Sequence, residues 1–330
     1  MRGNGPGFPG PKMMMRLSKS HRQWLADTFG QHIRFQEPMA RHTSLKVGGP
    51  ADAYVHPQSR KELLMLFQWL QQNDLPYFTI GNGTNLLVLD SGIRGIVISL
   101  KDCLKGIHHD PNGQDTVKLT VGAATRLSEL CRYAIRQGFR GMNFAVGIPG
   151  TLGGAIVMNA GTGHGSMADI VTAIEILSPE GDVVKICKED LSFHYRGVAW
   201  KRWPKASASA NPIILEALLG LSSADPGEIR AEADRFLKNR KERQPLDQRS
   251  AGSFFKNPET GKTAGELIDL AGLKGLQVGE AQVSEQHANW IINKGGARAA
   301  DILALKKMIQ ATVLATFKIK LETEVQIVGA

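Results

Sequence analysis

Residues 147–154, GIPGTLGG, place four glycines and one proline in eight positions, and AIVMNAGTGHG follows directly. Glycine has no Cβ and tolerates positive φ, so such a stretch lets bare backbone N–H groups approach a neighbour closely. A second stretch of this kind, GNGTN at 81–85, lies between the apolar segments YFTI and LLVL. These two loops constrain the fold more strongly than any other feature of the chain.

Neither loop has the context of the Rossmann dinucleotide fingerprint. That fingerprint needs an apolar strand before GxGxxG, a crossover helix after it and an acidic residue about twenty positions further on. In the first loop Pro149 occupies the turn, and AIVMNAG is too short for the crossover helix. In the second loop Leu86 stands where the third glycine belongs. An ordinary dinucleotide dehydrogenase is therefore disfavoured, and either loop alone could be a structural turn.

Taken together, the loops favour a pyrophosphate ligand. Consecutive N–H groups in glycine-rich turns converge on one anion, and a pyrophosphate needs donors on two sides. The predicted cofactor-binding residues are Gly81, Asn82, Gly83, Thr84, Asn85, Gly147, Ile148, Pro149, Gly150, Gly153, Gly154, Asn159 and Gly161.

The remaining patterns predict an α+β fold. Apolar strand patterns and helical patterns are mixed without regular βαβ alternation, which argues against a doubly wound sheet. The terminal KIKLETEVQIVG alternates apolar and polar residues and predicts a final strand with Glu324 on its polar face. A chain of 330 residues is too long for a single domain with one ordinary hydrophobic core, so we expect more than one domain. Asp225 to Glu228 has a helix-start pattern, so we expect a domain boundary near residue 224.

Charge and cysteine content exclude several classes of function. The net charge of +9 comes from Lys and Arg spread along the whole chain, with no recognition-helix or zinc signature, so we expect a small anionic ligand and no nucleic acid. Three cysteines without CxxC spacing predict neither a disulfide frame nor a metal site, and suit a reducing compartment. No apolar run has transmembrane length, so no membrane insertion and a cytoplasmic location are expected.

Three further side chains are candidates for chemistry, although pattern alone leaves them unassigned. Ser253 in RSAGSFFKNP has no GxSxG context and no evident His partner, so proton donation is more plausible than nucleophilic attack. Arg196 in the YR pair is typical of a surface residue but could also grip a carboxylate with two hydrogen bonds. Glu324 beside Lys320 is typical of a solvated edge carboxylate.

Seven motifs, in order, resemble those of the bacterial UDP-N-acetylenolpyruvoylglucosamine reductases, also called UDP-N-acetylmuramate dehydrogenases. The resemblance covers the chain from about residue 30 to the end. The motifs are HTSLKVGGPA (42–51), YFTIGNGTNLLV (77–88), GIPGTLGGAIVMNAG (147–161), YR (195–196), AGSFFKNP (251–258), AGLKGLQVGEAQVSEQHANWIIN (271–293) and LETEV (321–325).

The Gly and Pro density of residues 1–20 predicts a disordered tail. The resemblance, which begins after this tail, implies a flavoprotein. A two-lobed FAD-binding domain of the vanillyl-alcohol-oxidase-like class would occupy 21–224, split near 104, and a smaller α+β substrate-binding domain 225–330. NADPH would donate a hydride to FAD, which would reduce UDP-N-acetylenolpyruvoylglucosamine. No His or Cys stands at a recognisable attachment position, so FAD is expected to be held without a covalent bond.

The resemblance also implies roles for individual residues. Ser253 would donate the proton, and Arg196 and Glu324 would polarise the substrate carboxylate, with the pKa of Glu324 raised so that it does not repel the developing charge. Tyr195, Lys256 and Asn257 would contact the substrate. His194 and Gly197 depart from the expected residues beside the YR pair.

The segment 198–212 contains no Tyr, which favours the type of these enzymes that lacks a tyrosine-bearing closing loop.

Two alternatives to a reductase of this family stay open. A related FAD oxidase or dehydrogenase of a sugar or lactone would explain both glycine loops but not AGSFFKNP or LETEV. A non-enzymatic alternative is a basic protein that binds nucleotides or nucleic acid.

Overall fold

The computed structural model describes residues 17–110, 117–201, 212–259 and 261–329. The chain forms two compact units. The first takes its described residues from Met1–Arg34, Ala53–Gly81 and Gly95–Lys238, and the second from Phe35–Asp52, Asn82–Arg94 and Asn239–Ala330. Each unit is therefore assembled from separate stretches of sequence, and the continuous domains divided at residue 224 stay a prediction. Residues 1–16 of the predicted tail lie outside the described residues.

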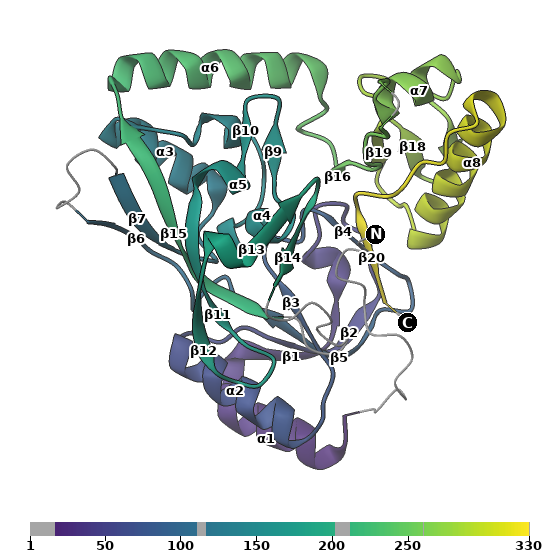
Figure 1. Cartoon of the computed structure of the whole chain (residues 1–330). Helices are drawn as coiled ribbons and strands as arrows, with labels where there is room; N and C mark the ends of the chain where they lie inside the picture. Colours follow the sequence, from purple (N-terminus) through teal and green to yellow (C-terminus); the bar gives the residue numbers. More distant parts are fainter. Residues whose placement is uncertain (1–16, 111–116, 202–211, 260, 330) are drawn as a thin grey trace. The chain divides into compact units, whose positions relative to one another are not determined.

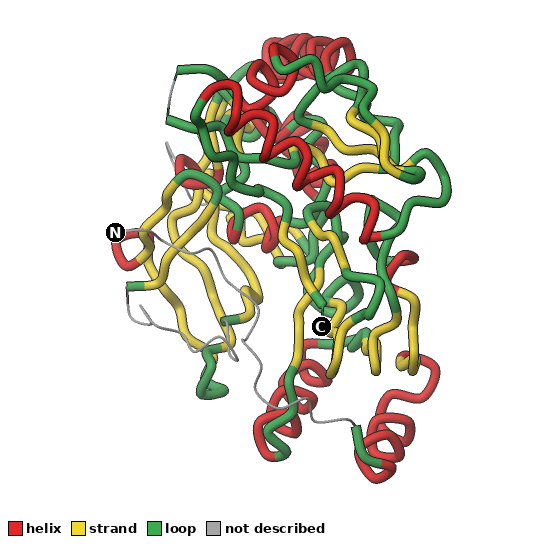
Figure 2. Tube along the Cα trace, turned by 90° about the vertical axis from the view of Figure 1, so that its right-hand side faces the viewer, coloured by secondary structure: helices red, strands yellow, loops and turns green. Residues whose placement is uncertain are grey.

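The first unit contains a six-stranded sheet of order β12-β11-β15-β7-β6, with β8 paired to β15, and these strands pair in antiparallel fashion. Its strands are β6 (Ile107–Asp110), β7 (Val117–Gly122), β8 (Phe139–Arg140), β11 (Val171–Leu177), β12 (Val183–Cys187) and β15 (Ile213–Ser223). Figure 2 shows the strands, in yellow, in several groups, and the strand order gives several sheets rather than one parallel sheet. The predicted α+β class is confirmed.

A second sheet has the order β1-β2-β5-β3, in which β3 (Tyr77–Ile80) and β5 (Ile93–Ser99) are parallel. Its other strands are β1 (Ile33–Pro38) and β2 (Pro50–Val55). The helices α1 (Lys19–Phe29) and α2 (Arg60–Gln72) lie side by side, as Figure 1 shows. Trp24 and Trp69 stack between them with ring centroids 4.1 Å apart. Ser59 caps α2 by accepting the N–H of Glu62, as N-terminal residues of this type do.

The first unit also contains three short helices and two short hairpins. The helices are α3 (Leu127–Gln137), α4 (Leu152–Val157) and α5 (Met167–Ile170), and the two hairpins are β9–β10 (Gly161–Thr162, Gly165–Ser166) and β13–β14 (Leu191–His194, Gly197–Trp200). The helix α6 (Pro226–Arg243) begins where the sequence predicts, because Asp225 Oδ1 accepts the N–H of Glu228 at 2.9 Å.

The second unit is a four-stranded antiparallel sheet of order β16-β19-β18-β17 with two helices. Its strands are β16 (Ser250–Ser253), β17 (Gln277–Val278), β18 (Ala281–Val283) and β19 (Trp290–Asn293), and its helices are α7 (Ala264–Leu270) and α8 (Ala299–Phe317). The helix α8 packs against β17 and β18 (Figure 1). Phe254, Phe255 and Ile309 lie in its core at no more than 1% exposure.

The predicted long terminal strand is wrong. Only Gln326–Val328 forms a strand, β20, which pairs in parallel with β4 (Leu86–Val88). Thr323 makes an isolated bridge to Phe255, and the N–H groups of Glu324 and Val325 both donate to the carbonyl of Phe254. The alternation of apolar and polar residues arises because Leu321 and Val325 are buried where this segment packs against Phe254 and Phe255. Such packing produces the same apolar pattern as a strand.

Candidate functional site

Gly81, the first residue of the GNGTN loop, lies beside the 147–154 loop in the first unit. A Cβ added at Gly81 would lie 2.5 Å from Oγ1 of Thr151, so only a residue without a side chain allows this approach. Thr151 is the N-cap of α4 and its hydroxyl accepts the N–H of Gly154 at 3.4 Å. Gly81 at the end of β3 and Thr151 at the start of α4 are therefore close neighbours.

Not every glycine N–H of the 147–154 loop points to an external ligand. The N–H of Gly153 donates to the carbonyl of Ala123 at 2.8 Å, and the carbonyl of Gly150 accepts the N–H of Leu127 at 3.1 Å. A Cβ at Gly153 would lie 3.0 Å from that of Ala123. Gly153 therefore serves close packing of α4 on the strand region before α3. Gly147, Ile148 and Pro149 form the turn that precedes this packed segment.

The second half of GNGTN belongs to the second unit. Gly83 has φ of 60°, and a Cβ there would lie 2.1 Å from the carbonyl oxygen of His42. Its own carbonyl accepts the N–H of Ser44 at 3.1 Å, and the Ser44 hydroxyl donates to Thr84 O at 3.4 Å. The motif HTSLKVGG is thus the support of this loop. Asn82 lies in the bend before Gly83, and Thr84 and Asn85 form the turn.

Asn85 connects this loop to the C-terminal motif. Its Nδ2 donates to the backbone carbonyl of Glu324 at 3.1 Å, and its own carbonyl accepts the N–H of Gln326 at 3.0 Å. The predicted cofactor residue and the predicted catalytic residue are thereby hydrogen-bonded neighbours in one unit.

Arg196 lies in the turn of the β13–β14 hairpin, in the first unit. It has φ of 60°, a conformation that costs a non-glycine residue energy and often marks a functional site. Its Nη1 donates to the carbonyl of Gly161 at 3.3 Å, and its guanidinium lies 5.0 Å from the ring centroid of Tyr195. The Tyr195–Arg196 turn is therefore tied to the end of the glycine-rich segment.

Asn159 makes the second tie between these segments. Its Nδ2 donates to the carbonyl of His194 at 3.1 Å, while its Oδ1 accepts the N–H of Ala168 at 3.0 Å. The unexpected pair beside the turn has a geometric explanation, because a Cβ at Gly197 would lie 2.3 Å from the His194 ring. The small residue makes room for the large one.

Ser253 and Glu324 come together in the second unit. Ser253 ends β16 and pairs with Trp290, and the next residue, Phe254, accepts the N–H of Glu324 at 2.9 Å. Lys256 N–H donates to the carbonyl of Glu322 at 2.8 Å. Ser253 and Lys256 are half-buried on either side of the buried Phe254 and Phe255, and Glu324, on the C-terminal segment, is half-buried as well.

Asn257 has a clear local role. Its Oδ1 accepts the N–H of Ala264 at 3.0 Å, at the start of α7. This bond orients the side chain next to Lys256, and the sequence pattern gave no sign of it.

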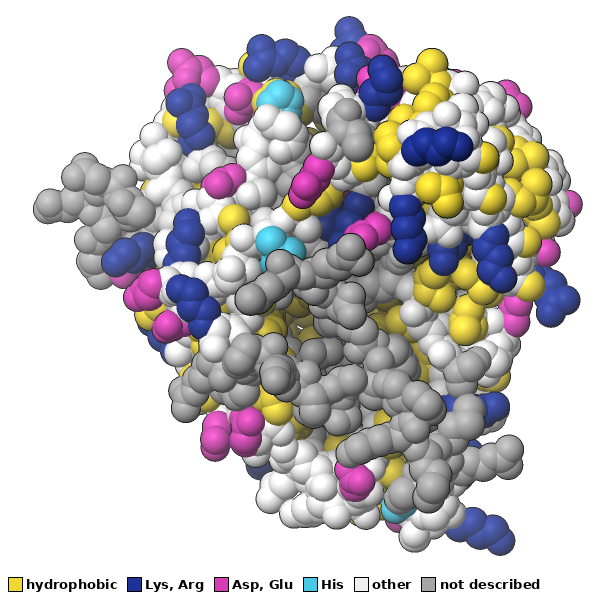
Figure 3. Space-filling model, turned by 45° about the vertical axis from the view of Figure 1, so that its right-hand side comes forward, with side chains coloured by type: hydrophobic (Ala, Val, Ile, Leu, Met, Phe, Trp, Pro, Cys, Tyr) yellow, Lys and Arg dark blue, Asp and Glu magenta, His cyan; other side chains and the backbone are white. Residues whose placement is uncertain are grey.

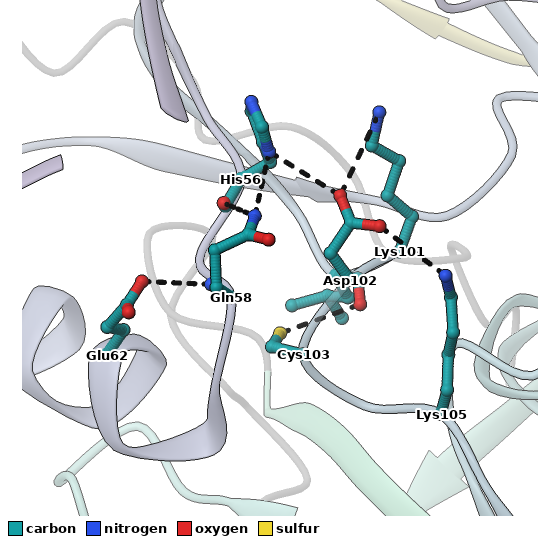
Figure 4. A network of polar contacts seen from close by, with 8 residues as sticks. His56, Gln58, Glu62, Lys101, Asp102, Cys103 and Lys105 are labelled. Carbon is teal, nitrogen blue, oxygen red and sulfur yellow. Dashed lines mark hydrogen bonds and ion pairs between the residues drawn. The ribbon is translucent and has the colours of Figure 1, made fainter. Parts of the chain in front are cut away.

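A polar cluster outside the predicted site lies where β2 and β5 end (Figure 4). His56 Nδ1 is 3.4 Å from Asp102 Oδ2, and Asp102 also pairs with Lys105 at 3.4 Å. Burial, followed by the charge of Lys101, lowers the pKa of His56 below its ordinary value. The backbone N–H of Gln58 binds Glu62, so the cluster fastens the start of α2. Across the ranges described above, no three His, Cys, Asp or Glu side chains form a metal-binding group.

The positive charge of the chain is dispersed. On the face that Figure 3 shows, Lys and Arg side chains lie among acidic and hydrophobic ones rather than in one continuous stripe. A stripe of that kind is the usual footprint of nucleic-acid binding. None of the helices in the described ranges is long and apolar enough to span a bilayer.

Two family models match the chain. Residues 51–186 match the FAD binding domain, and residues 244–328 match the UDP-N-acetylenolpyruvoylglucosamine reductase, C-terminal domain. A protein of Desulfosudis oleivorans named UDP-N-acetylenolpyruvoylglucosamine reductase is 46% identical over 95% of this chain and 100% of its own length. A protein of the same name from Heliobacterium modesticaldum is 41% identical over 92% of each chain.

Among solved structures, the UDP-N-acetylenolpyruvylglucosamine reductase of Thermus caldophilus is similar to this chain. It has a TM-score of 0.73 and 36% sequence identity, over 88% of this chain and 97% of its own.

Proposed function

The chain belongs to the UDP-N-acetylenolpyruvoylglucosamine reductase family, and from this premise we propose that Ser253, Arg196 and Glu324 carry its reaction. It is an FAD-dependent oxidoreductase that uses NADPH to reduce UDP-N-acetylenolpyruvoylglucosamine to UDP-N-acetylmuramate, a precursor of peptidoglycan. The observation that carries this function is 46% identity to a reductase over that protein's whole length.

The residues present fit FAD. Gly81 and Thr151 bring two glycine loops together where a side chain would fill the space between them, as the pyrophosphate of a dinucleotide requires. When bound, FAD supplies the redox chemistry by accepting a hydride from NADPH and delivering one to the substrate. We propose that the loop residues predicted above hold it, with Gly153 acting through close packing and Asn85 also supporting Glu324.

The protein's own groups then complete the reduction. A hydride added to one carbon of the enolpyruvyl double bond forms a C–H bond there and displaces the π-electron pair of the double bond toward the neighbouring carbon and the carboxylate. Arg196 stabilises the negative charge that develops there, and its guanidinium is held by the carbonyl of Gly161. Ser253 donates its hydroxyl proton to the second carbon, which yields the lactyl ether. Tyr195, Lys256 and Asn257 contact the substrate, and the serine recovers its proton from solvent.

Glu324 helps only as a neutral or hydrogen-bonded group, since a bare carboxylate would repel the charge that forms. We therefore expect Glu324→Gln to retain most of kcat, and Glu324→Ala to lower it by roughly 10²-fold. Steady-state NADPH oxidation at saturating substrate measures both. The variant Glu322→Ala, two residues away and exposed, controls for loss of one negative charge. A Gln variant as slow as the Ala variant would show that an ionised carboxylate is needed.

The test of the function is an absorption spectrum followed by a substrate-dependent assay. The purified protein should be yellow, and it should oxidise NADPH only when UDP-N-acetylenolpyruvoylglucosamine is present. A flavin-replete preparation that ignores this substrate contradicts the proposal, and oxidation of a sugar or lactone instead would establish the related oxidase or dehydrogenase. A colourless protein would favour the non-enzymatic alternative.

We also propose that the reaction takes place in the cytoplasm. The proposal is supported by three cysteines that form no disulfide, because structural disulfides belong to oxidising compartments.

A further inference from the structure

The backbone of Phe254 and Phe255, which joins Ser253 to Lys256, is held mainly by one residue, Asn289. The N–H of Phe254 donates to the backbone carbonyl of Asn289 at 2.7 Å. The N–H of Phe255 donates to Asn289 Oδ1 at 2.9 Å, and Asn289 Nδ2 donates to the carbonyl of Phe255 at 2.8 Å. Three of the four polar backbone groups of this dipeptide are therefore bound by Asn289.

The fourth polar backbone group, the carbonyl of Phe254, is bound by Glu324. The carbonyl of Phe254 accepts the N–H of Glu324 at 2.9 Å. The segment thus has the proton donor Ser253 before it, Lys256 after it, and the backbone of Glu324 bound to its middle. A shift of Phe254 or Phe255 moves all three functional residues.

Burial makes the choice of side chain at 289 specific. Asn289 is 3% exposed and both phenylalanines are 1% exposed, so water does not readily replace a lost partner. An amide carries an acceptor and a donor together and satisfies an N–H and a C=O at once. Aspartate keeps the acceptor but places a second oxygen against the Phe255 carbonyl, and alanine removes both groups.

Asn289 is itself positioned by a compact turn. Its N–H donates to Nδ1 of His287 at 3.2 Å, and the N–H of Trp290 donates to the His287 carbonyl at 3.0 Å. Trp290 in turn pairs with Ser253. The HANW motif (residues 287–290) therefore contacts residues 253–255 through its backbone and through the side chain of Asn289.

We infer that Asn289 is a positioning residue that aligns Ser253 and Glu324 for the reduction of the substrate. The inference rests on the proposed roles of these two residues. It adds a role for a residue that touches no substrate and lies far from both in the sequence.

The experiment compares two buried asparagines of the same region. Asn293 is 4% exposed, and its side chain makes three hydrogen bonds, to the carbonyl of Leu45 and to the N–H groups of Gly295 and Ala297. None of these bonds reaches the 253–256 segment. The side chain of Asn289 makes two, both to Phe255. Asn293→Ala should therefore lose at least as much stability as Asn289→Ala, but only Asn289→Ala should displace the 253–256 segment.

Rapid-mixing absorbance of the FAD-loaded enzyme separates the two half-reactions. We expect Asn289→Ala to slow reoxidation of the flavin by substrate roughly 10²-fold while reduction by NADPH stays at the wild-type rate. Hydrogen exchange should become faster in the peptide that covers residues 250–258. Asn293→Ala should leave both rates unchanged.

The variant Asn289→Asp gives a pH signature that a general loss of stability does not produce. Its buried carboxyl must be protonated to donate to the Phe255 carbonyl, so its reoxidation rate should rise as pH falls, relative to wild type. This variant also serves if Asn289→Ala does not fold, since the aspartate is nearly the same size.

The outcomes separate the inference from the proposed function. A wild-type reoxidation rate in Asn289→Ala, or equal slowing in Asn293→Ala, overturns the inference, as does an Asn289→Asp pH profile that matches wild type. If Ser253→Ala, measured in parallel, reoxidises normally, the proposed function fails instead.

Discussion

Replacing Ser253 with alanine is expected to abolish nearly all turnover while leaving the first half-reaction intact. The alanine has no proton to give, so reoxidation of the flavin by substrate should fall on the order of 10³-fold. Reduction of the flavin by NADPH needs no proton from this residue and should keep its rate. Rapid-mixing absorbance of the flavin measures each half-reaction separately.

The buried Ser250 supplies the matched control. It lies on the same strand, β16, pairs with Ile292 and is 7% exposed. Ser250→Ala removes a hydroxyl from that strand without touching the candidate site, so both rates should stay near wild type. If Ser253→Ala slows both half-reactions equally, the serine is a structural or binding residue and the proton comes from another source.

The half-reaction assay is informative because of where Ser253 lies. Its neighbour Phe254 is buried and bonded to both Asn289 and Glu324. The substitution therefore removes one hydroxyl from a segment whose backbone remains fixed by other bonds. Any loss of rate then reports chemistry rather than displacement.

Local signals predicted the start of α6 accurately. The helix begins after Asp225 because the capping acid and the helix-start pattern that follows it lie within one short stretch of sequence. The same kind of reasoning failed at the C-terminus. There, Leu321 and Val325 are buried because their segment packs against Phe254 and Phe255. A short apolar pattern does not distinguish such packing from burial in a strand.

Contacts between distant parts of the sequence explain what pattern reasoning missed. Asn85 reaches Glu324 across 239 positions, and Asn289 reaches Phe255 across 34. A single sequence gives no signal for such pairs, since an isolated asparagine is typical of a turn. Ser253, Arg196 and Glu324 were likewise unassigned by pattern, and the family resemblance supplied their proposed roles.

Arg196 carries the second large expected effect. Arg196→Ala should lower the rate of flavin reoxidation by substrate roughly 10²- to 10³-fold, because it removes the fixed positive charge that meets the developing negative charge. Arg196→Lys should fall between wild type and Ala, since lysine keeps the charge but lacks the planar fork that binds a carboxylate with two hydrogen bonds. The same rapid-mixing assay measures both variants.

The backbone conformation at residue 196 allows Arg196→Ala and Arg196→Lys to be compared directly. Arg196 has φ of 60°, and alanine and lysine pay a similar cost in that conformation, so the two variants differ mainly in side-chain chemistry. Arg136→Ala, an exposed arginine in the last turn of α3, controls for the loss of one charge from a chain of net charge +9 that binds an anionic substrate. Equal slowing in Arg136→Ala that disappears at high salt would assign the effect to long-range attraction. A defect confined to residue 196 and insensitive to salt assigns it to the carboxylate contact, because a bond made inside the closed complex is screened far less than an approach through solvent.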